Sequence, residues 1–430
     1  MKKIDVPALA RVEGEGGLYI GVEDNKVVEI RLDIYEPPRF FEGFLVGRYL
    51  QEVPDITARI CGICPVAYQM SSVTALETAL GVDVSPQVYA LRRLMYCGEY
   101  IESHALHIYL LQAPDLLGQP SALDLASIAP ALVKDALRMK KIGNEVLKVI
   151  GGRSVHPVNA CVGGFYRWPE VSALKALLPE LEWGLEAAKE TVRWSLSLKY
   201  PELEVDYEFV ALHHPEEYGV MHGEVWSSKG NKTAVADYET CYFEEHVQHS
   251  NALHGHTSIG GTYLVGPLAR LNLNHDQLSP EAQKALKESK LKLPFKNPYK
   301  SLIARAIELV HFYEEAIQLI QTYNPSGPAR INLNLQAGMG AGASEAPRGL
   351  LYHRYEIDNN GLIKFAKIVP PTAQNLPRIE ADLFALAPKL VKMKEDQATL
   401  TAEHLVRAYD PCISCATHFL KLMVENVGSA

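Results

Sequence analysis

Apolar and polar positions alternate over residues 17–34, with a break at Asp24-Asn25. This period-two alternation predicts an N-terminal β-hairpin. From about residue 40 to 200 the apolar positions recur at the spacing of an amphipathic helix instead. They predict long helices at about 66–80, 86–111, 123–149 and 169–198.

The second half of the chain has a more mixed pattern. Residues 203–275 favour short strands and loops, and a charged surface helix is predicted at about 279–292 and a long helix at 298–323. We expect strands at 329–336, 351–357 and 362–369, followed by helices at 375–393, 400–408 and 413–427. No Pro-, Gly- or Ser-rich linker divides the chain. The sequence therefore predicts one large α+β domain in which helices dominate.

Composition narrows the class of protein. The chain has 430 residues, 47% hydrophobic and 22% charged, as in a soluble globular protein. Its net charge of -9 argues against a nucleic-acid partner, which would need a basic face. We see no apolar run long enough to span a membrane and no signal peptide. Seven cysteines are too few for a disulfide scaffold and fit a reducing compartment, so we expect a cytoplasmic protein.

Four of the cysteines form two CxxC pairs, Cys61 with Cys64 and Cys412 with Cys415. Each pair is predicted to open a helix, whose N-terminal partial charge lowers a thiol pKa. Two thiols at i and i+3 can face one ion, and soft sulfur suits Zn, Ni, Cu(I) or Fe–S. A structural zinc site normally has its pairs about 12–20 residues apart. Here most of the chain separates the pairs, so independent redox pairs or unrelated buried thiols stay open.

The other cysteines, Cys97, Cys161 and Cys241, are isolated. Isolated cysteines most often act as small buried hydrophobic residues. Since no further cysteine group remains, we expect no Fe–S cluster in this chain. A redox centre here would then need another chain to carry its electrons away.

Further motifs accompany the two pairs in a fixed order along the chain. They include Arg11-Val12-Glu13-Gly14-Glu15 and Ala346-Pro347-Arg348-Gly349. With these, the sequence resembles the large, catalytic subunit of nickel–iron hydrogenases over essentially its whole length. The segments that carry the resemblance are residues 11–15, 59–64, 151–164, 265–270, 346–349 and 410–418.

The resemblance implies a helix-dominated fold with a central bundle of long helices and small peripheral sheets. It also implies a Ni-Fe(CN)2CO centre, in which Cys61 and Cys412 bind nickel alone while Cys64 and Cys415 bridge to the iron. The family reaction is reversible heterolytic cleavage of H2 into a proton and a hydride. Cys412 would be the first proton acceptor, because its thiolate is basic and next to the reacting site.

Five more residues receive roles through the resemblance. Glu13 matches a proton-relay glutamate, since a carboxylic acid beside a metal-bound thiol can take a proton and pass it outward. Arg348 matches an arginine over the open side of the metals, which Asp115 and Asp410 would hold in place because an unpaired buried charge is costly. Thr372 matches a hydrogen-bond donor to an iron-bound cyanide. Without the resemblance, Glu13 would be interpreted as a surface acid and Asp410 as a turn residue.

The resemblance extends to a second metal and to maturation. Glu42 and His418 match the ligands of a structural Mg²⁺ or Fe²⁺ ion, an oxygen and an imidazole. In the family a protease cuts after the position of His418 once nickel is in. We therefore expect a domain over residues 1–418 and a cleavable extension over 419–430. Tyr68 stands where many relatives have histidine, and we expect it to tune the site.

The resemblance implies a heteromultimer. We expect an Fe–S small subunit, flavin- and NAD(P)-binding subunits, nickel-insertion factors and a maturation protease, because the compact chain looks most like the cytosolic NAD(P)-linked or sulfhydrogenase-type group. The chain itself shows no nucleotide-binding signature. Two alternatives remain. One is a relative resembling the complex I quinone-site subunit, which has lost the nickel ligands, and the other is a zinc-stabilised interaction subunit.

Overall fold

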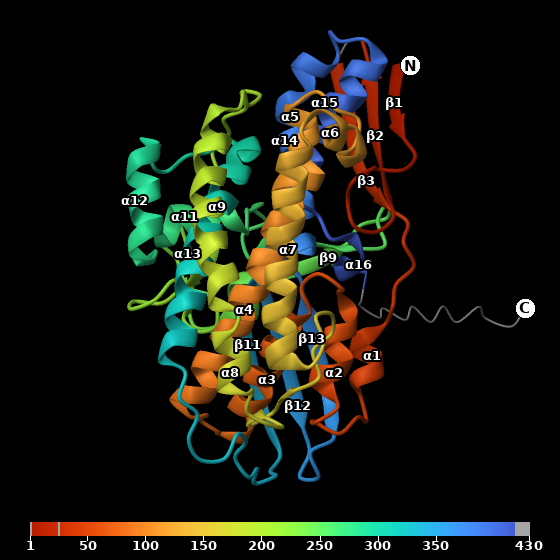
Figure 1. Ribbon diagram of the computed structural model, residues 1–430. Coiled ribbons are helices and arrows are strands. Elements are labelled where there is room, and N and C mark those ends of the chain that lie inside the picture. Colours follow the sequence, from red (N-terminus) through yellow and green to blue (C-terminus); the bar gives the residue numbers. More distant parts are fainter. Residues whose placement is uncertain (1, 25, 418–430) are drawn as a thin grey trace, which may run out of the picture.

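Four long helices pack side by side through the middle of the molecule (Figure 1). They are α4 (Pro86–Leu106), α7 (Pro130–Gly151), α9 (Leu178–Ser197) and α13 (Ser301–Thr322). In this computed structural model, which describes residues 2–24 and 26–417, α4 contacts α7 and α13, and α13 contacts α9. The predicted helix-dominated α+β class with a central bundle is confirmed.

Other helices surround the bundle, and two of the predicted long helices, at 123–149 and 169–198, are each divided into two. The predicted helix over 123–149 is divided before Pro130, because proline lacks an amide hydrogen and its ring clashes with the preceding turn. The surrounding helices are α1 (Phe41–Leu45), α2 (Val53–Thr57), α3 (Pro65–Leu80), α5 (Ala113–Leu116), α6 (Ala122–Ile128), α8 (Val171–Lys175), α10 (Tyr238–Cys241), α11 (Pro267–Asn274), α12 (Pro280–Ser289), α14 (Pro371–Leu390), α15 (Glu395–Ala408) and α16 (Ile413–Ala416).

The sheets are small and antiparallel. The predicted N-terminal hairpin is β2 (Gly16–Glu23) with β3 (Lys26–Ile34), and β1 (Lys2–Val6), which was not predicted, adds a third strand. A second three-stranded sheet contains β11 (Gly338–Ala346), β12 (Gly349–Ile357) and β13 (Ile363–Val369). The remaining strands are β4 (Ala160–Cys161), β5 (Gly164–Phe165), β6 (Val210–His213), β7 (Glu224–Ser227), β8 (Lys232–Thr233), β9 (Tyr242–His246) and β10 (Leu253–Thr257).

The strand predicted at 329–336 is wrong, because the strand lies further on, at Gly338–Ala346. This strand has glycine at every second position from Gly338 to Gly342, and glycine is depleted in strands. The structure gives the reason for these glycines. Strand β11 lies directly on α3, and a Cβ at Gly340 would stand 2.1 Å from the carbonyl oxygen of Ala75.

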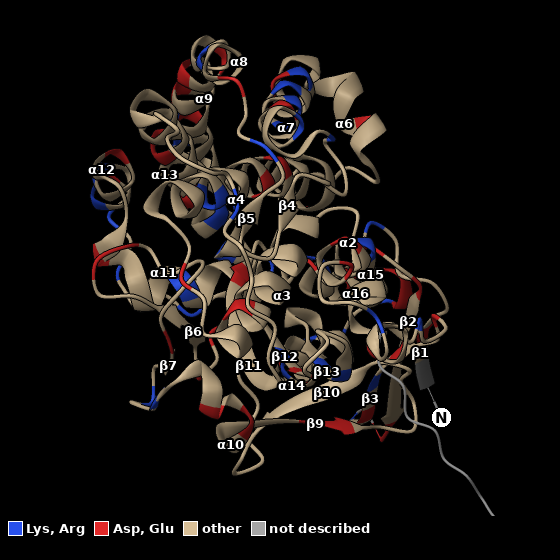
Figure 2. Cartoon of the chain, turned by 90° about the horizontal axis from the view of Figure 1, so that it is seen from below, with Lys and Arg blue, Asp and Glu red and all other residues tan. Residues whose placement is uncertain are grey.

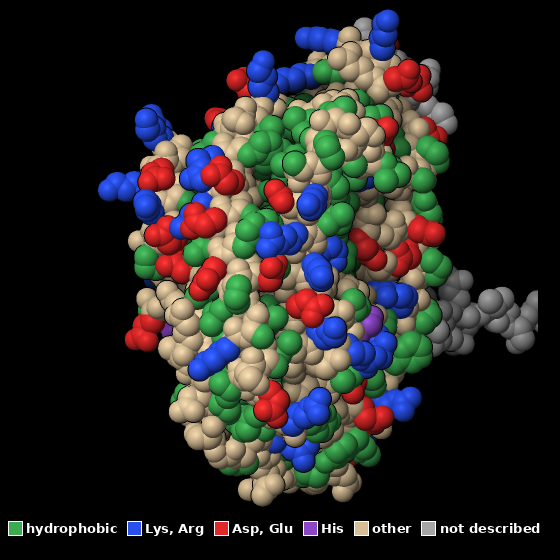
Figure 3. Space-filling model, in the orientation of Figure 1, with side chains coloured by type: hydrophobic (Ala, Val, Ile, Leu, Met, Phe, Trp, Pro, Cys, Tyr) green, Lys and Arg blue, Asp and Glu red, His purple; other side chains and the backbone are tan. Residues whose placement is uncertain are grey.

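Charged side chains lie inside the molecule as well as on its surface. Figure 2 shows blue segments in the interior beside α4 and α11. One buried pair is Arg92 of α4 with Glu77 of α3, whose two bonds measure 2.7 and 2.8 Å. On the face in Figure 3, charges of both signs are interspersed, and apolar side chains gather near the top, where α6 exposes Leu123 and Ile128. No helix of the described residues has the length and apolar character to cross a membrane.

Candidate metal centre

Folding brings the two CxxC pairs together, and all four cysteines are buried. The Sγ atoms of Cys61 and Cys412 lie 3.7 Å apart, and those of Cys64 and Cys415 lie 3.9 Å apart. Within the second pair, the Cys412 and Cys415 Sγ atoms are 2.7 Å apart. Ligand atoms of Cys61, Cys412 and Cys415 lie within 4.8 Å of one another. The chain thus groups three sulfur atoms as ligands for one ion and places the fourth, that of Cys64, beside Cys415.

The first pair sits between a short 3-10 helix, Ala58–Ile60, and helix α3. Cys61 is extended, and its sulfur accepts backbone N–H bonds from Ile63 at 3.3 Å and from Cys64 at 3.2 Å. Cys64 occupies the position before the first helical residue, as predicted. The segment between the 3-10 helix and α3 therefore directs the sulfur atoms of Cys61 and Cys64 into the interior.

Glu99 of α4 caps this helix from the side, a role that the sequence did not reveal. Its carboxylate accepts N–H bonds from Val66 at 2.6 Å and from Ala67 at 3.2 Å. The first-turn amides of a helix lack partners within the helix, and Cys64 provides no side-chain cap. Burial raises the pKa of Glu99 well above its ordinary value. The only signal in the sequence was a helix start without a capping Ser, Thr, Asp or Asn.

The second pair is held by the N-terminal segment. A parallel β-bridge joins Glu13 to Cys412, and the N–H of Ile413 donates to the Glu13 carbonyl oxygen at 2.9 Å. Gly14 follows Glu13, and a Cβ at this position would stand 2.7 Å from the Cβ of Ile413. Glycine is therefore required here for the two segments to approach so closely. The Cys412 N–H donates to the Thr372 hydroxyl at 3.0 Å.

The side chain of Glu13 reaches the sulfur of Cys412. Its Oε2 lies 3.0 Å from Cys412 Sγ, within the reach of an S–H···O bond, and also accepts the Ser414 N–H at 3.1 Å. The residue is partly exposed, whereas Cys412 is buried. Glu13 therefore connects the thiol cluster to a position nearer the solvent.

Arg348 lies at the tip of the β11–β12 hairpin. Ala346 pairs with Gly349, so Pro347 and Arg348 form a two-residue loop between the strands. The Arg348 Nε donates to the Asp410 carbonyl oxygen at 2.9 Å, and its Nη2 meets Asp410 Oδ1 at 3.0 Å. Its buried Nη1 has no hydrogen-bond partner among the described residues.

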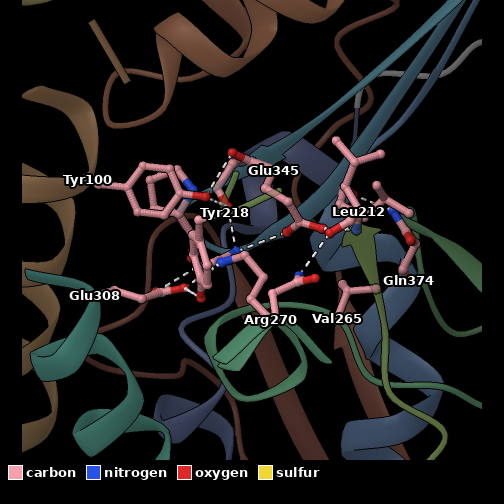
Figure 4. A network of polar contacts seen from close by, with 12 residues as sticks. Tyr100, Leu212, Tyr218, Val265, Arg270, Glu308, Glu345 and Gln374 are labelled. Carbon is pink, nitrogen blue, oxygen red and sulfur yellow. Dashed lines mark hydrogen bonds and ion pairs between the residues drawn. The ribbon is translucent and has the colours of Figure 1, made fainter. Parts of the chain in front are cut away.

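A buried ionic network supports this hairpin (Figure 4). Arg270 lies between Glu308 and Glu345, with nitrogen–oxygen distances of 2.6–2.9 Å. The same guanidinium donates to the carbonyl oxygens of Ala346 and Pro347, each at 2.9 Å. Arg270 thus fixes the backbone on which Arg348 stands. The sequence pointed to the segment 265–270 only as a familiar motif and did not assign this role.

The prediction that Asp115 pairs with Arg348 is wrong. Asp115 instead meets Arg407 of α15 at 2.7 Å and His404 at 3.0 Å, and it accepts a bond from Arg11. Burial opposes ionisation, but the hydrogen bonds from His404 and Arg407 lower the pKa of Asp115 to about 2. Because Arg11 stands two residues before Glu13, this ion pair anchors the N-terminal segment and leaves Asp410 as the carboxylate partner of Arg348.

The thiols have unlike protonation preferences. Burial raises the pKa of Cys412, and so do its neighbours Cys415, Cys61 and Cys64. Burial also acts to raise the pKa of Cys61, but hydrogen bonds from the neighbouring thiols and the charge of Arg348 lower it well below its ordinary value. Four adjacent thiolates repel one another, so a cation is required to hold all four deprotonated.

Other predicted residues are described only in part. The Glu42 carboxylate accepts the Ile368 N–H at 2.8 Å. Its predicted co-ligand His418 and the predicted extension 419–430 lie outside the described residues. Tyr68 is fully buried, and in the described structure its hydroxyl has no hydrogen-bond partner. Burial and the nearby cysteines raise the Tyr68 pKa well above its ordinary value, so the phenol stays protonated.

The residues present fit a nickel–iron centre with diatomic ligands. Four buried sulfur atoms supply the soft donors that nickel and iron take. The unpartnered Nη1 of Arg348 offers a hydrogen bond to an additional acceptor, as a cyanide would be. Helical bundle and thiol cluster together define the class: the metal-binding catalytic subunit of a redox enzyme.

Comparison with known proteins identifies the family. A profile described as nickel-dependent hydrogenase matches residues 39–134 and 259–418. The chain is 35% identical to sulfhydrogenase 1 subunit alpha of Pyrococcus furiosus, over 97% of this chain and 98% of that one. It is 36% identical to sulfhydrogenase 2 subunit alpha of the same organism, over 97% and 100%.

A solved structure extends the likeness to three dimensions. The crystal structure of an NAD+-reducing [NiFe]-hydrogenase in the H2-reduced state matches with a TM-score of 0.89 at 27% identity, over 97% of this chain and 100% of that one. The chain belongs to the nickel-dependent hydrogenase family, and it is a hydrogenase catalytic subunit.

Proposed function

We propose that this chain oxidises H2 reversibly at a Ni-Fe(CN)2CO centre held by Cys61, Cys64, Cys412 and Cys415. The sulfur atoms of these four cysteines would supply the protein ligands of the two metals. The observation that carries the proposal is the convergence of four buried thiols, with Sγ distances of 2.7–3.9 Å, from opposite ends of the chain. When bound, the centre supplies the Lewis acidity and redox capacity for heterolytic H2 cleavage.

The chain's own groups would move the proton. Cys412 Sγ would receive it, because this sulfur lies 3.0 Å from the Glu13 carboxylate. Glu13 Oε2, 3.0 Å away, would accept the proton next and pass it toward solvent. The bond from the Ser414 N–H to the same oxygen keeps the carboxylate aimed at the sulfur.

Arg348 would bind and orient at the open side of the centre. Its Nε and Nη2 are fixed by Asp410, which leaves Nη1 for a cyanide or for H2 polarisation. Thr372 already accepts the Cys412 N–H, so its hydroxyl proton remains for an iron-bound cyanide. Glu42 and His418 would hold a Mg²⁺ or Fe²⁺ ion that ties the C-terminal segment to the β13 strand.

Electrons would leave through partner chains. The described cysteines outside the cluster are dispersed, with Cys97 beside Glu315 and Cys241 beside Thr233. This supports an Fe–S small subunit as the first acceptor. The complex would also contain flavin- and NAD(P)-binding subunits and be cytoplasmic; the likeness to an NAD+-reducing hydrogenase supports the nucleotide as acceptor. Nickel-insertion factors and a maturation protease that acts after His418 would complete the centre.

The test is metal analysis and turnover of the whole complex, matured and purified without oxygen. We expect one nickel per chain and H2-dependent reduction of NAD+ or NADP+. Hydrogen uptake with a dye but with neither nucleotide would contradict the NAD(P) assignment alone. One zinc in place of nickel, without H2 activity, would support an interaction subunit. A matured protein without metal in the thiol cluster would support a complex I-like relative.

A further inference from the structure

A second cluster of metal-ligating side chains lies outside the thiol centre. It joins His249 in the loop before β10, His254 in β10 and Glu380 in α14. One ligand atom from each of the three lies within 4.8 Å of the others. The residues come from two elements that pack together, and no role in the hydrogenase reaction accounts for them.

The side chains of the cluster lie close together. His249 Nε2 lies 3.0 Å from Glu380 Oε1, and the two imidazole rings meet edge to face with centroids 5.6 Å apart. The Leu32 N–H donates to the same Glu380 oxygen at 2.8 Å and fixes the carboxylate.

A second, independent observation that points to a bound ligand comes from the side chain of His254. Its side chain is 2% exposed, yet its buried Nε2 has no hydrogen-bond partner in the part of the chain that the structure describes. A buried polar atom without a partner costs free energy unless a ligand or water satisfies it. Burial lowers the pKa of His254 to about 3, so the imidazole is neutral and its lone pair is available at neutral pH.

The charges around the cluster favour a cation. Glu380 is an acid, and Asp33 of β3, which also pairs with Arg31 at 3.3 Å, lies close enough for its charge to act on both Glu380 and His249. Burial raises the pKa of Glu380, although the Leu32 N–H and His249 act in the opposite direction. Two imidazoles and a carboxylate suit zinc or a similar first-row ion, whereas Mg²⁺ and Ca²⁺ prefer oxygen ligands alone.

We infer that His249, His254 and Glu380 form a binding site for a divalent transition-metal ion such as Zn²⁺, separate from the thiol centre. The ion would brace helix α14 against the β9–β10 ribbon. Thr372, which holds the backbone of Cys412, stands on the same helix, about 12 Å along its axis from Glu380 at 1.5 Å per residue. Partial exposure of His249 and Glu380 gives the ion a path from solvent.

The test uses the matured enzyme complex, with the thiol centre filled, after removal of loosely bound metal by a chelator. Zinc is then titrated into the wild type and into the variants His254→Gln and Glu380→Gln. Glu380→Gln keeps an oxygen for the Leu32 N–H but loses the anionic ligand. His256→Gln is the matched control, because His256 lies on the same strand but pairs with Glu245.

We expect the wild type and the control to bind one more zinc per chain than either variant. Added zinc should raise the Tm of the wild type and leave that of the variants unchanged. Zinc X-ray absorption of the wild type should show nitrogen and oxygen neighbours at about 2.0–2.1 Å. Equal zinc content in the wild type and both variants, or a sulfur shell at about 2.3 Å, would overturn the inference.

Discussion

Replacement of Glu13 by Gln removes the proposed proton acceptor from the thiol centre with little change in shape. The amide oxygen can still accept the Ser414 N–H, which now lies 3.1 Å from Glu13 Oε2. The backbone bridge to Cys412 does not involve the side chain. We therefore expect Glu13→Gln to fold and to assemble its metal centre as the wild type does.

The magnitude follows from the direct contact of 3.0 Å between Cys412 Sγ and Glu13 Oε2. A positioned acid or base contributes roughly 10²–10⁴-fold to a rate. At 1.36 kcal/mol per decade, this loss corresponds to about 3–5 kcal/mol in the barrier for proton transfer. The variant should be slowed by that factor in every reaction that moves a proton to or from the centre.

The assay is exchange between H2 and D2O, followed by mass spectrometry of the gas above the whole complex. Glu15→Gln is the control, because Glu15 is an exposed acid two positions away and should leave the rate unchanged. Nickel and iron contents of both variants must equal those of the wild type. If Glu13→Gln then retained exchange within threefold of the wild type, the relay role of Glu13 would be refuted.

Three further predictions concern stability. Arg270→Met leaves the buried Glu308 and Glu345 without their cation. It should lower the free energy of unfolding, measured by chemical denaturation, by about 3–5 kcal/mol. The control Arg138→Met, on the surface, should leave the Tm unchanged. Gly340→Ala should cost about 1–3 kcal/mol through the clash with α3, and a Tm equal to that of the wild type would contradict this packing. Burial raises the pKa of Glu102 to about 7, so the folded state binds its proton more tightly than the unfolded state does. The stability that Glu102 contributes is therefore present below about pH 4.5 and lost as the pH rises through about 7, and Glu102→Gln should remove this slope from plots of unfolding free energy against pH.

Local periodicity predicted the long helices, because an amphipathic stripe is a property of neighbouring residues. It failed at β11, where the glycines at alternate positions are dictated by contact with α3. Such a contact joins segments that are far apart in the sequence, Gly340 and Ala75, and no local pattern records it. Propensity alone therefore favoured a strand some residues too early.

The candidate site, like the fold, was predictable where the signal is local and not where it depends on contacts between distant segments. The residue type and spacing of the four cysteines suggested a metal site, whereas Glu13, Arg348 and Asp410 received their roles only through the family resemblance; the structure brings all of them together. Asp115 stood in an equally recognisable motif, yet its partners are Arg407 and His404. Which cation a buried carboxylate meets depends on how the helices pack, and the sequence does not contain that information locally.

The supporting groups were the hardest to predict. Glu99 caps α3 from another helix, and Arg270 holds the hairpin of Arg348 from α11. Both are charged residues with apolar neighbours on either side, which is a signal of burial with a partner but not of the partner's identity. Their roles became visible only from the hydrogen bonds of the folded chain.

Infrared spectroscopy of the matured enzyme tests the central claim most directly. Iron with one CO and two cyanides gives one CO band and two cyanide bands, in a region of the spectrum where proteins absorb little. We predict all three bands in the wild type and their loss when Cys64→Ser removes one of the four proposed sulfur ligands. A nickel-loaded, matured wild-type protein without these bands would contradict the assignment of the four cysteines to a nickel–iron centre.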